Sequence, residues 1–212
     1  MKTKIKILVT GSEGFVGSHL VEGLLKKGYS VRAFVYYNSF NNIGWLTEFS
    51  SNYKNLEIYF GDIRDYNSVL NSLKGIDIIY NLAALISIPY SYKSPESYID
   101  VNTYGTFNLL NAARKYKIKK FFQISTSEVY GSAEYTPIDE NHPLKAQSPY
   151  AATKIAADQI SYSFMCSYDL PIVILRPFNI FGPRQSLRAI IPTVISQVIN
   201  NKEEINLGNI YS

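Results

Sequence analysis

Residues 4–17 read Lys-Ile-Lys-Ile-Leu-Val-Thr-Gly-Ser-Glu-Gly-Phe-Val-Gly, and this stretch decides the fold. Its first seven residues predict a short buried strand, and residues 18–27 continue with the spacing of a helix that ends at Gly28. Glycines between a strand and a helix let the backbone approach a pyrophosphate at the helix N-terminus. We therefore interpret this turn as a dinucleotide site and not only as a tight turn. The residues expected to contact the cofactor here are Gly11, Gly14, Phe15, Val16 and Gly17.

The rest of the chain alternates short apolar runs with helical segments. This alternation predicts an α/β fold with a parallel, doubly wound, Rossmann-like sheet that binds ligands at the carboxyl ends of its strands. We expect a dinucleotide-binding domain over residues 1–185 and the beginning of a smaller substrate-binding lobe over 186–212. The later strands are predicted at Val31–Val35, Leu56–Phe60, Ile76–Tyr80, Phe121–Ile124, Ile172–Leu175 and Ile205–Leu207, and helices at Ser94–Tyr116, from Tyr150 and from Ala189.

Composition and charge are those of a globular chain, with 46% hydrophobic residues, 18% charged residues and a net charge of +4 over 212 residues. A diffuse charge of this size does not predict binding to nucleic acid or to a membrane surface. The single cysteine, Cys166, excludes an internal disulfide and a metal site made of cysteines. No apolar run reaches the roughly 18 residues of a membrane span, and no signal peptide precedes the first strand, so we expect a cytoplasmic protein.

The end of the second predicted strand departs from the usual dinucleotide pattern. An Asp or Glu often stands there and holds the ribose hydroxyls, but residues 35–38 read Val-Tyr-Tyr-Asn. We expect Tyr36, Asn38 or the backbone to hold the ribose instead. Because a 2′-phosphate requires a cation and no Arg stands there, the sequence favours NAD, with NADP as the alternative.

Two further strand ends carry residues that suit a cofactor. Asp62 can accept a hydrogen bond from the adenine amino group while Ile63 covers the ring; the alternative is that Asp62 caps the next helix. The fourth strand leads into small side chains, which would let a cofactor lie against the backbone. We expect contacts from Leu82, Ala83 and Ala84.

A polar segment follows the fifth predicted strand, and a helix start comes after it. Ser148 is a good N-cap, Pro149 suits the first helical position, and Tyr150 and Lys154 then share one helix face. A neighbouring cation favours the phenolate, and moving a Tyr pKa towards 7 requires roughly 4 kcal/mol, which one Lys and an oxidised nicotinamide could supply. In a chain with 18 Tyr this pair alone is weak evidence, but the hydroxyls and the carboxylate of residues 125–128 strengthen it.

In combination these motifs resemble the extended short-chain dehydrogenase/reductase family. The Thr-Ser-Glu order at 126–128 is similar to nucleotide-sugar 4,6-dehydratases of the GDP-mannose type, whereas dTDP-glucose dehydratases have Asp at the position of Ser127. Residues 37–41 and 84–92 resemble the subgroup that acts on nucleotide-linked N-acetylglucosamine in legionaminic acid pathways. The segments that carry the family resemblance are Gly11-x-x-Gly14-x-x-Gly17, Asp62-Ile63, Asn81-Leu82-Ala83-Ala84, Asn102, Tyr150-x-x-x-Lys154 and Arg176-Pro177-x-Asn179.

The resemblance implies dehydration of a nucleotide-sugar by an enzyme that regenerates its cofactor in each turnover. Tyr150 would act as the base at the sugar C4 hydroxyl, and Thr126 would bind the C4 oxygen. Lys154 would lower the pKa of Tyr150 and hold the nicotinamide ribose, so that both residues also contact the cofactor. Glu128 would abstract the C5 proton and, because Ser127 replaces a second carboxylate, would also serve the departing C6 hydroxyl. The resemblance further implies cofactor contacts at Asn102, Ser125 and Pro177, substrate contacts at Ser87, Ser127, Asn179 and Arg184, and no metal.

Three other functions stay open from the sequence. A UDP-glucuronate decarboxylase shares a Thr-Ser-Glu segment but requires a cation for the C6 carboxylate. A UDP-sugar 4-epimerase would leave Glu128 idle, and a non-enzymatic NAD-binding sensor would not need the catalytic set. We also expect a homodimer through the helices at 94–116 and 149–168; the alternative is that their apolar faces only pack in the core. From a chain that holds only the start of a substrate lobe we expect cofactor binding with weak or absent turnover.

Overall fold

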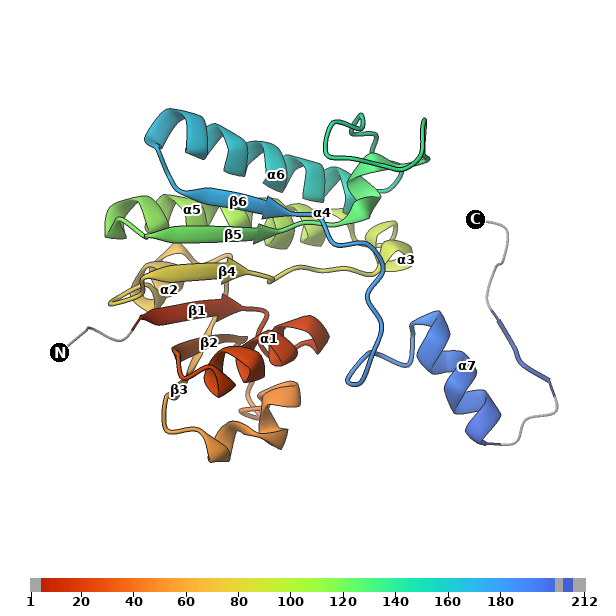
Figure 1. Cartoon of the computed structure of the whole chain (residues 1–212), viewed down its shortest axis with the longest axis horizontal. Helices are drawn as coiled ribbons and strands as arrows, with labels where there is room; N and C mark the ends of the chain where they lie inside the picture. The colour runs from red at the N-terminus through yellow and green to blue at the C-terminus, as the bar shows by residue number, and fades with distance from the viewer. Residues whose placement is uncertain (1–4, 201–203, 208–212) are drawn as a thin grey trace. The chain divides into compact units, whose positions relative to one another are not determined.

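Two units, residues 1–178 and 179–212, make up the chain in a computed structural model that describes residues 5–200 and 204–207 (Figure 1). The first unit contains the sheet, and the described residues of the second unit include one helix. The predicted boundary between residues 185 and 186 stays a prediction.

The first unit is built on a six-stranded parallel sheet with the order β3-β2-β1-β4-β5-β6. β1 pairs with β2 on one side and with β4 on the other, which confirms the doubly wound sheet predicted from the sequence. The strand arrows in Figure 1 point to the same side, so the carboxyl ends of the strands share one edge. The predicted start of the first strand, Lys4, lies outside the described residues. The strands are β1 Lys6–Thr10, β2 Ser30–Tyr36, β3 Leu56–Gly61, β4 Ile78–Asn81, β5 Lys120–Ile124 and β6 Ile172–Leu175.

Helices cover both faces of this sheet, because successive strand residues point to opposite faces. On one face, Val21 of the first helix joins a core with Val9. On the other face, Val69 and Leu109 join a core with Phe121. Among the described residues, no helix has the length and apolarity that a membrane span requires. The helices are α1 Phe15–Lys26, α2 Tyr66–Ser72, α3 Ile88–Ser91, α4 Pro95–Tyr98, α5 Gly105–Tyr116, α6 Pro149–Tyr168 and α7 Ile190–Ile199, with 3₁₀ turns at Gly44–Glu48, Ser50–Asn52 and Ser127–Tyr130.

Local chemistry places two helix ends where the sequence predicts them. Ser148 caps α6, because its hydroxyl accepts a hydrogen bond from the Ala151 N–H at 3.0 Å, and Pro149 occupies the first helical position. Gly28 follows α1 with a φ of 83°, a left-handed conformation that glycine adopts without steric cost. The cap at Ser148 fixes the start of the helix that carries Tyr150.

The prediction of one continuous helix over residues 94–116 was wrong, because the structure interrupts it. A π-helical turn, Ile99–Tyr104, separates α4 from α5. Asn102 lies in this turn, and its side chain hydrogen-bonds the loop after β4 and a side chain of α6. Turns of this kind occur frequently at functional sites, where they redirect a side chain that a regular helix would place elsewhere.

The second unit consists of α7 and its neighbouring loops. The strand predicted at Ile205–Leu207 was wrong, because the described part of the chain shows no strand pairing there. The backbone N–H and C=O of Asn206 instead hydrogen-bond the Gln197 side chain on α7, at 2.7 and 2.9 Å. Within this unit, α7 and the loop before it line a cavity of about 550 Å³.

Candidate active site

Buried polar side chains tie the carboxyl ends of the central strands together. The Thr10 hydroxyl donates to Asn81 Oδ1 at 2.7 Å and accepts from the backbone N–H groups of Leu82 and Ala83 at 3.1 and 3.0 Å. Asn81 in turn donates to Gln123 Oε1 on β5 at 2.8 Å. Paired polar networks of this kind make their surroundings rigid, so the loop after β4 is held beside the glycine turn.

The glycine turn fits closely against that loop. Gly11 has a φ of 61°, and a Cβ there would lie 3.0 Å from the backbone of Ala83. A Cβ at Gly17 would lie only 2.1 Å from the Gly11 carbonyl oxygen. These two positions therefore require glycine, while Gly14 and Val16 are exposed at the start of α1. The backbone at the N-terminus of this helix is open to an anionic group.

A cavity of about 430 Å³ opens between the glycine turn and the ends of β2, β3 and β4. Its volume lies within the roughly 300–1,000 Å³ of small-molecule sites. Glu13, Phe34 and Arg64 also line it, together with Tyr90 and Val101 of the helical region beyond β4. The residues in its wall that the sequence predicted to bind a cofactor are Gly11, Tyr36, Asp62, Ile63, Ala83 and Ala84.

An ion pair with Arg64 holds Asp62, the residue that follows β3. Arg64 Nε and Nη2 donate to its carboxylate at 3.0 and 2.6 Å, which lowers the pKa of Asp62 and raises that of Arg64. Arg64 Nη2 also lies 3.3 Å from the Tyr36 hydroxyl. The helix cap is Asp65, which accepts from the Asn67 N–H at 2.9 Å, so the alternative that Asp62 caps α2 was wrong. A cation thus lies near the end of β2, which the sequence at that strand did not reveal.

Two amides predicted to contact the cofactor hydrogen-bond within the protein. Asn38 pairs with the backbone N–H and C=O of Asn42, both at 2.9 Å, and so closes its own loop. Asn102 pairs with the backbone N–H and C=O of Leu85 at 2.8 and 3.0 Å and donates to the Thr153 hydroxyl at 3.0 Å. Asn102 therefore joins the loop after β4 to α6.

Thr126 and Glu128 lie just after β5, and Tyr150 of α6 lies near them. The Thr126 hydroxyl accepts from the Glu128 N–H at 3.2 Å and hydrogen-bonds the Tyr150 phenol. Burial raises the pKa of Tyr150, which is 7% exposed; the Thr126 hydrogen bond lowers this pKa, and the negative charge of Glu128 raises it. The net direction is opposite to the one expected from Lys154, because desolvation is the largest effect.

Lys154 is buried one helical turn beyond Tyr150. Its ammonium donates to the Ile124 carbonyl oxygen at 2.6 Å. Burial lowers the pKa of Lys154 to about 8, and the negative charge of Asp158 opposes that shift. The lysine is therefore held at the end of β5 in a state that can release its proton near neutral pH.

The sequence did not reveal Asp158, nor that Arg176, which it singled out only as part of a family motif, pairs with it. Asp158 accepts from the Ser125 hydroxyl at 2.9 Å and from Arg176 Nε at 3.0 Å, and Arg176 Nη1 donates to the Tyr130 hydroxyl at 3.1 Å. Burial raises the pKa of Asp158, and the two hydrogen bonds lower it. The available signal was spacing, because Asp158 follows Lys154 by the same four residues that separate Lys154 from Tyr150.

The pKa of Lys154 leads to a testable pH dependence of stability. Its folded-state pKa of about 8 lies below the ordinary 10.5, so above pH 8 the unfolded chain binds this proton more tightly than the folded chain. Between pH 8 and 10 the wild type should gain about 2 kcal/mol of unfolding free energy relative to Lys154→Met. Urea denaturation of both proteins at several pH values measures this difference. Exposed Lys93→Met serves as the control, and parallel pH profiles for wild type and Lys154→Met would contradict the prediction.

The remaining predicted residues are distributed over both units. Ser87 stands at the N-cap of α3, and the Ser127 N–H donates to the Pro177 carbonyl oxygen at 3.1 Å. Asn179 and Arg184 belong to the second unit. The described part of the chain contains no group of three or more His, Cys, Asp or Glu placed to hold a metal ion.

Comparison with known proteins identifies relatives over nearly the whole chain. The family model of GDP-mannose 4,6 dehydratase matches residues 8–212. A dTDP-D-glucose 4,6-dehydratase of Dictyostelium discoideum is 35% identical over 216 residues, covering 93% of this chain and 49% of that protein. The crystal structure of DesIV, a dTDP-glucose 4,6-dehydratase from Streptomyces venezuelae with NAD and TYD bound, has a TM-score of 0.84 at 30% identity, covering 93% of this chain and 63% of that one. A UDP-N-acetylglucosamine 4-epimerase from Methanobrevibacter ruminantium M1, in complex with UDP-N-acetylmuramic acid, has a TM-score of 0.87 at 34% identity, covering 97% and 66%.

The chain spans about half to two thirds of the length of these relatives. The family match includes the glycine turn, the Thr126 segment and the Tyr150 helix, and it confirms the resemblance seen in the sequence. The chain therefore belongs to the family of GDP-mannose 4,6-dehydratase and its relatives, the nucleotide-sugar dehydratases and epimerases of the extended short-chain dehydrogenase/reductase group.

Proposed function

We propose that this protein is a nucleotide-sugar 4,6-dehydratase that uses NAD. The observation that carries the proposal is the convergence of Thr126, Glu128 and Tyr150 at the end of β5. A phenol and a carboxylate close together can serve two proton transfers, one at C4 and one at C5 of a sugar ring. A reaction confined to C4 would require the phenol of Tyr150 but would not require the carboxylate of Glu128.

The glycine turn and the cavity fit NAD. A Cβ at Gly11 or Gly17 would collide with the loop after β4 or with the turn itself, so glycine keeps the turn tight at the start of α1, where the pyrophosphate would lie. Asp62, Ile63 and Ala83 line the cavity that would hold the adenosine. When bound, NAD supplies a hydride acceptor for sugar C4 and later a hydride donor for C6.

Side chains of this protein would transfer the protons at C4 and C5 of the sugar. Tyr150 takes the proton of the C4 hydroxyl, and Thr126 holds the phenol and the C4 oxygen by hydrogen bonds. Because burial raises the pKa of Tyr150, its ionisation requires nearby positive charge, which Lys154 carries when protonated. Glu128 would then take the C5 proton, made acidic by the C4 ketone, and give it to the C6 hydroxyl, which leaves as water. When hydride returns to C6, C5 regains a proton, which balances the one that Tyr150 took from the C4 hydroxyl.

For the substrate we propose GDP-mannose or a GDP- or UDP-linked N-acetylglucosamine. Ser127 stands where dTDP-glucose dehydratases have Asp, and residues 84–92 resemble the legionaminic acid subgroup. In the first unit, Ser87 and Ser127 are the proposed contacts to the sugar. In the second unit, Asn179 and Arg184 are proposed as substrate-binding residues. Contacts to the diphosphate favour cationic side chains such as Arg184.

A UDP-sugar 4-epimerase is the second candidate. The observation that favours it is the TM-score of 0.87 to a solved UDP-N-acetylglucosamine 4-epimerase. Such an enzyme would use Thr126, Tyr150 and Lys154 in the same roles, and Glu128 would not take part in its reaction.

Mass spectrometry of product mixtures separates these functions. The chain, and the longest natural form in which it occurs, would be incubated with GDP-mannose, GDP- and UDP-N-acetylglucosamine and UDP-glucuronate. Loss of one water from a hexose substrate supports the dehydratase, and loss of carbon dioxide from UDP-glucuronate indicates a decarboxylase. A product of unchanged mass but different chromatographic mobility indicates the epimerase and overturns the proposal.

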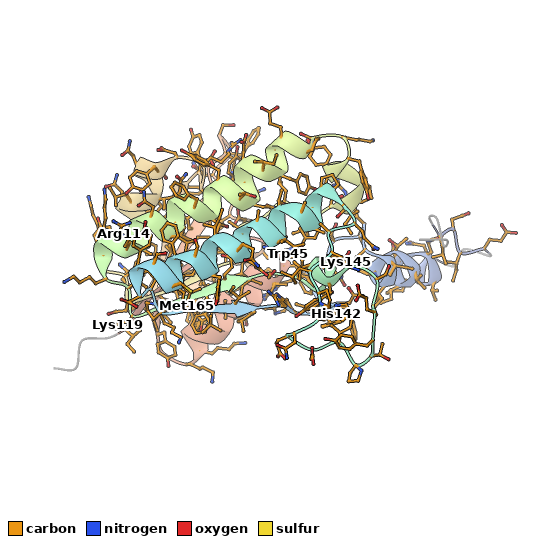
Figure 2. The ribbon with its side chains drawn as sticks, turned by 90° about the horizontal axis from the view of Figure 1, so that it is seen from above. Trp45, Arg114, Lys119, His142, Lys145 and Met165 are labelled. Atoms are coloured by element: carbon orange, nitrogen blue, oxygen red, sulfur yellow. The ribbon has the colours of Figure 1, made fainter. Side chains whose placement is uncertain are left out.

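The proposal includes a homodimer formed through α5 and α6. Figure 2 shows these helices, yellow-green and cyan, side by side, with Arg114 and Met165 labelled on them. Exposed apolar side chains on adjacent helices mark an interaction surface, and a second copy of the same surface is a natural partner for it. The side chains concerned are Tyr104, Phe107, Tyr162, Met165 and Tyr168, which are 36–53% exposed.

Replacing Tyr162 with Glu should weaken this dimer by about tenfold or more, because a charge would be placed within an apolar contact. Sedimentation equilibrium measures the dissociation constant. Phe40→Glu, on an exposed side chain outside both helices, should leave it unchanged. A wild-type chain that stays monomeric at high concentration would disprove the dimer.

A further inference from the structure

The chain lacks an acidic residue at the end of β2, yet a carboxylate lies there. Glu13, from the glycine turn, accepts a hydrogen bond through Oε1 from the backbone N–H of Tyr36, the last residue of β2, at 2.9 Å. In dinucleotide folds the acid at this place binds the ribose hydroxyls of the adenosine. Glu13 of the glycine turn thus places a carboxylate at the end of β2, where the sequence of β2 itself has none.

Glu13 is held in this position by its surroundings. Its carbonyl oxygen accepts from the Trp45 N–H at 3.1 Å, and a Cβ at Gly44 would lie 2.6 Å from that same oxygen. The loop after β2 therefore packs directly on Glu13. These contacts hold the Glu13 backbone and the Tyr36 N–H holds its carboxylate, so the side chain loses little conformational freedom when a ligand arrives.

One oxygen of this carboxylate lacks a partner. Glu13 lines the 430 Å³ cavity, and its Oε2 is buried without a hydrogen-bond donor among the residues that the structure describes. A buried carboxylate oxygen without a donor is costly, so a partner is expected from outside the protein. A ribose hydroxyl that enters the cavity and displaces the atoms covering Oε2 is a donor of the required kind.

The charges around this end of the cavity disfavour an additional anion. Glu13 and Asp62 carry one negative charge each, and Arg64 carries one positive charge, which leaves one net negative charge. The Arg64 guanidinium is already engaged by Asp62. A 2′-phosphate on the ribose would add further negative charge beside Glu13, where no second cation lines the cavity in the described residues.

We propose that Glu13 binds the adenosine ribose hydroxyls and selects NAD over NADP. This inference rests on the proposed function, because it requires a dinucleotide in this cavity. The rival explanation is that Glu13 only satisfies the Tyr36 N–H. Glu13→Gln separates the two, because the amide oxygen can still accept from Tyr36 while the charge is lost.

The test is a titration of the chain with NAD⁺ and NADP⁺, followed by calorimetry and by the fluorescence of Trp45, the single tryptophan. Wild type should prefer NAD⁺ by about tenfold or more, and Glu13→Gln should weaken NAD⁺ binding by about tenfold and reduce the preference. Glu140→Gln, which removes an exposed carboxylate outside the cavity, should behave as wild type.

Measurements with 2′-deoxy-NAD⁺ keep the inference testable if Glu13→Gln does not fold. Wild type should bind 2′-deoxy-NAD⁺ about tenfold more weakly than NAD⁺. Equal affinities, or an unchanged NAD⁺ preference in Glu13→Gln, would show that Glu13 only caps β2, while NAD binding itself stands. Failure of wild type to bind either dinucleotide would remove the proposed function and this inference together.

Discussion

Glu128→Gln is expected to lower the rate of water elimination by about 10²–10⁴-fold while leaving NAD affinity unchanged. The amide cannot accept the C5 proton, and Ser127 beside it offers no second carboxylate. Oxidation at C4 should continue, because the negative charge of Glu128 raises the pKa of Tyr150 and its removal lowers that pKa. The 4-keto sugar that still carries its C6 hydroxyl should therefore accumulate, and rapid-quench mass spectrometry measures it.

Two further variants test whether the effect is specific to the Glu128 carboxylate. Glu140→Gln removes an exposed carboxylate from the loop between β5 and α6 and should turn over as wild type does. Glu128→Asp keeps the charge on a shorter side chain and should retain part of the elimination rate. Unchanged turnover in Glu128→Gln would remove Glu128 from the mechanism and favour the epimerase.

The parts of the fold that the sequence predicted rest on local chemistry. Alternating apolar runs determine the parallel sheet, and the Ser148 cap determines where α6 begins. Gly17 is required by contacts within its own turn, and Gly11 is favoured by its φ of 61°, so the sequence reveals both. Each of these features depends mainly on neighbours in the chain.

The parts that could not be predicted depend on residues distant in sequence. Arg64 approaches Tyr36 because β2 and β3 are paired, and Glu13 reaches the same strand end because the first turn bends back over β2. The π-helical turn forms where Asn102 meets the backbone of Leu85. Likewise, the pKa of Tyr150 follows from burial, which spacing alone does not show.

Gly17→Ala is expected to lower the free energy of unfolding by about 3 kcal/mol, the upper part of the usual range for overpacking. The new Cβ would lie 2.1 Å from the Gly11 carbonyl oxygen and 2.9 Å from Ser12 Cα, so the backbone of the turn itself must move. A loss of this size lowers the melting temperature by roughly 6–12 °C in a protein of this length. Because the same turn would cradle the pyrophosphate, NAD binding should fall as well.

Gly23→Ala is the matched control, because it introduces the same methyl group in the same helix. Apart from its chain neighbours and the backbone of α1 itself, no heavy atom of the described residues lies within 4 Å of a Cβ at Gly23. Replacing a glycine inside α1 with alanine should therefore raise the free energy of unfolding by about 0.5–1 kcal/mol. Thermal and urea denaturation of both variants measures the contrast. Equal stabilities for Gly17→Ala and Gly23→Ala would mean that the turn at Gly11 accommodates a side chain at position 17. This turn would then not require glycine in order to approach a diphosphate.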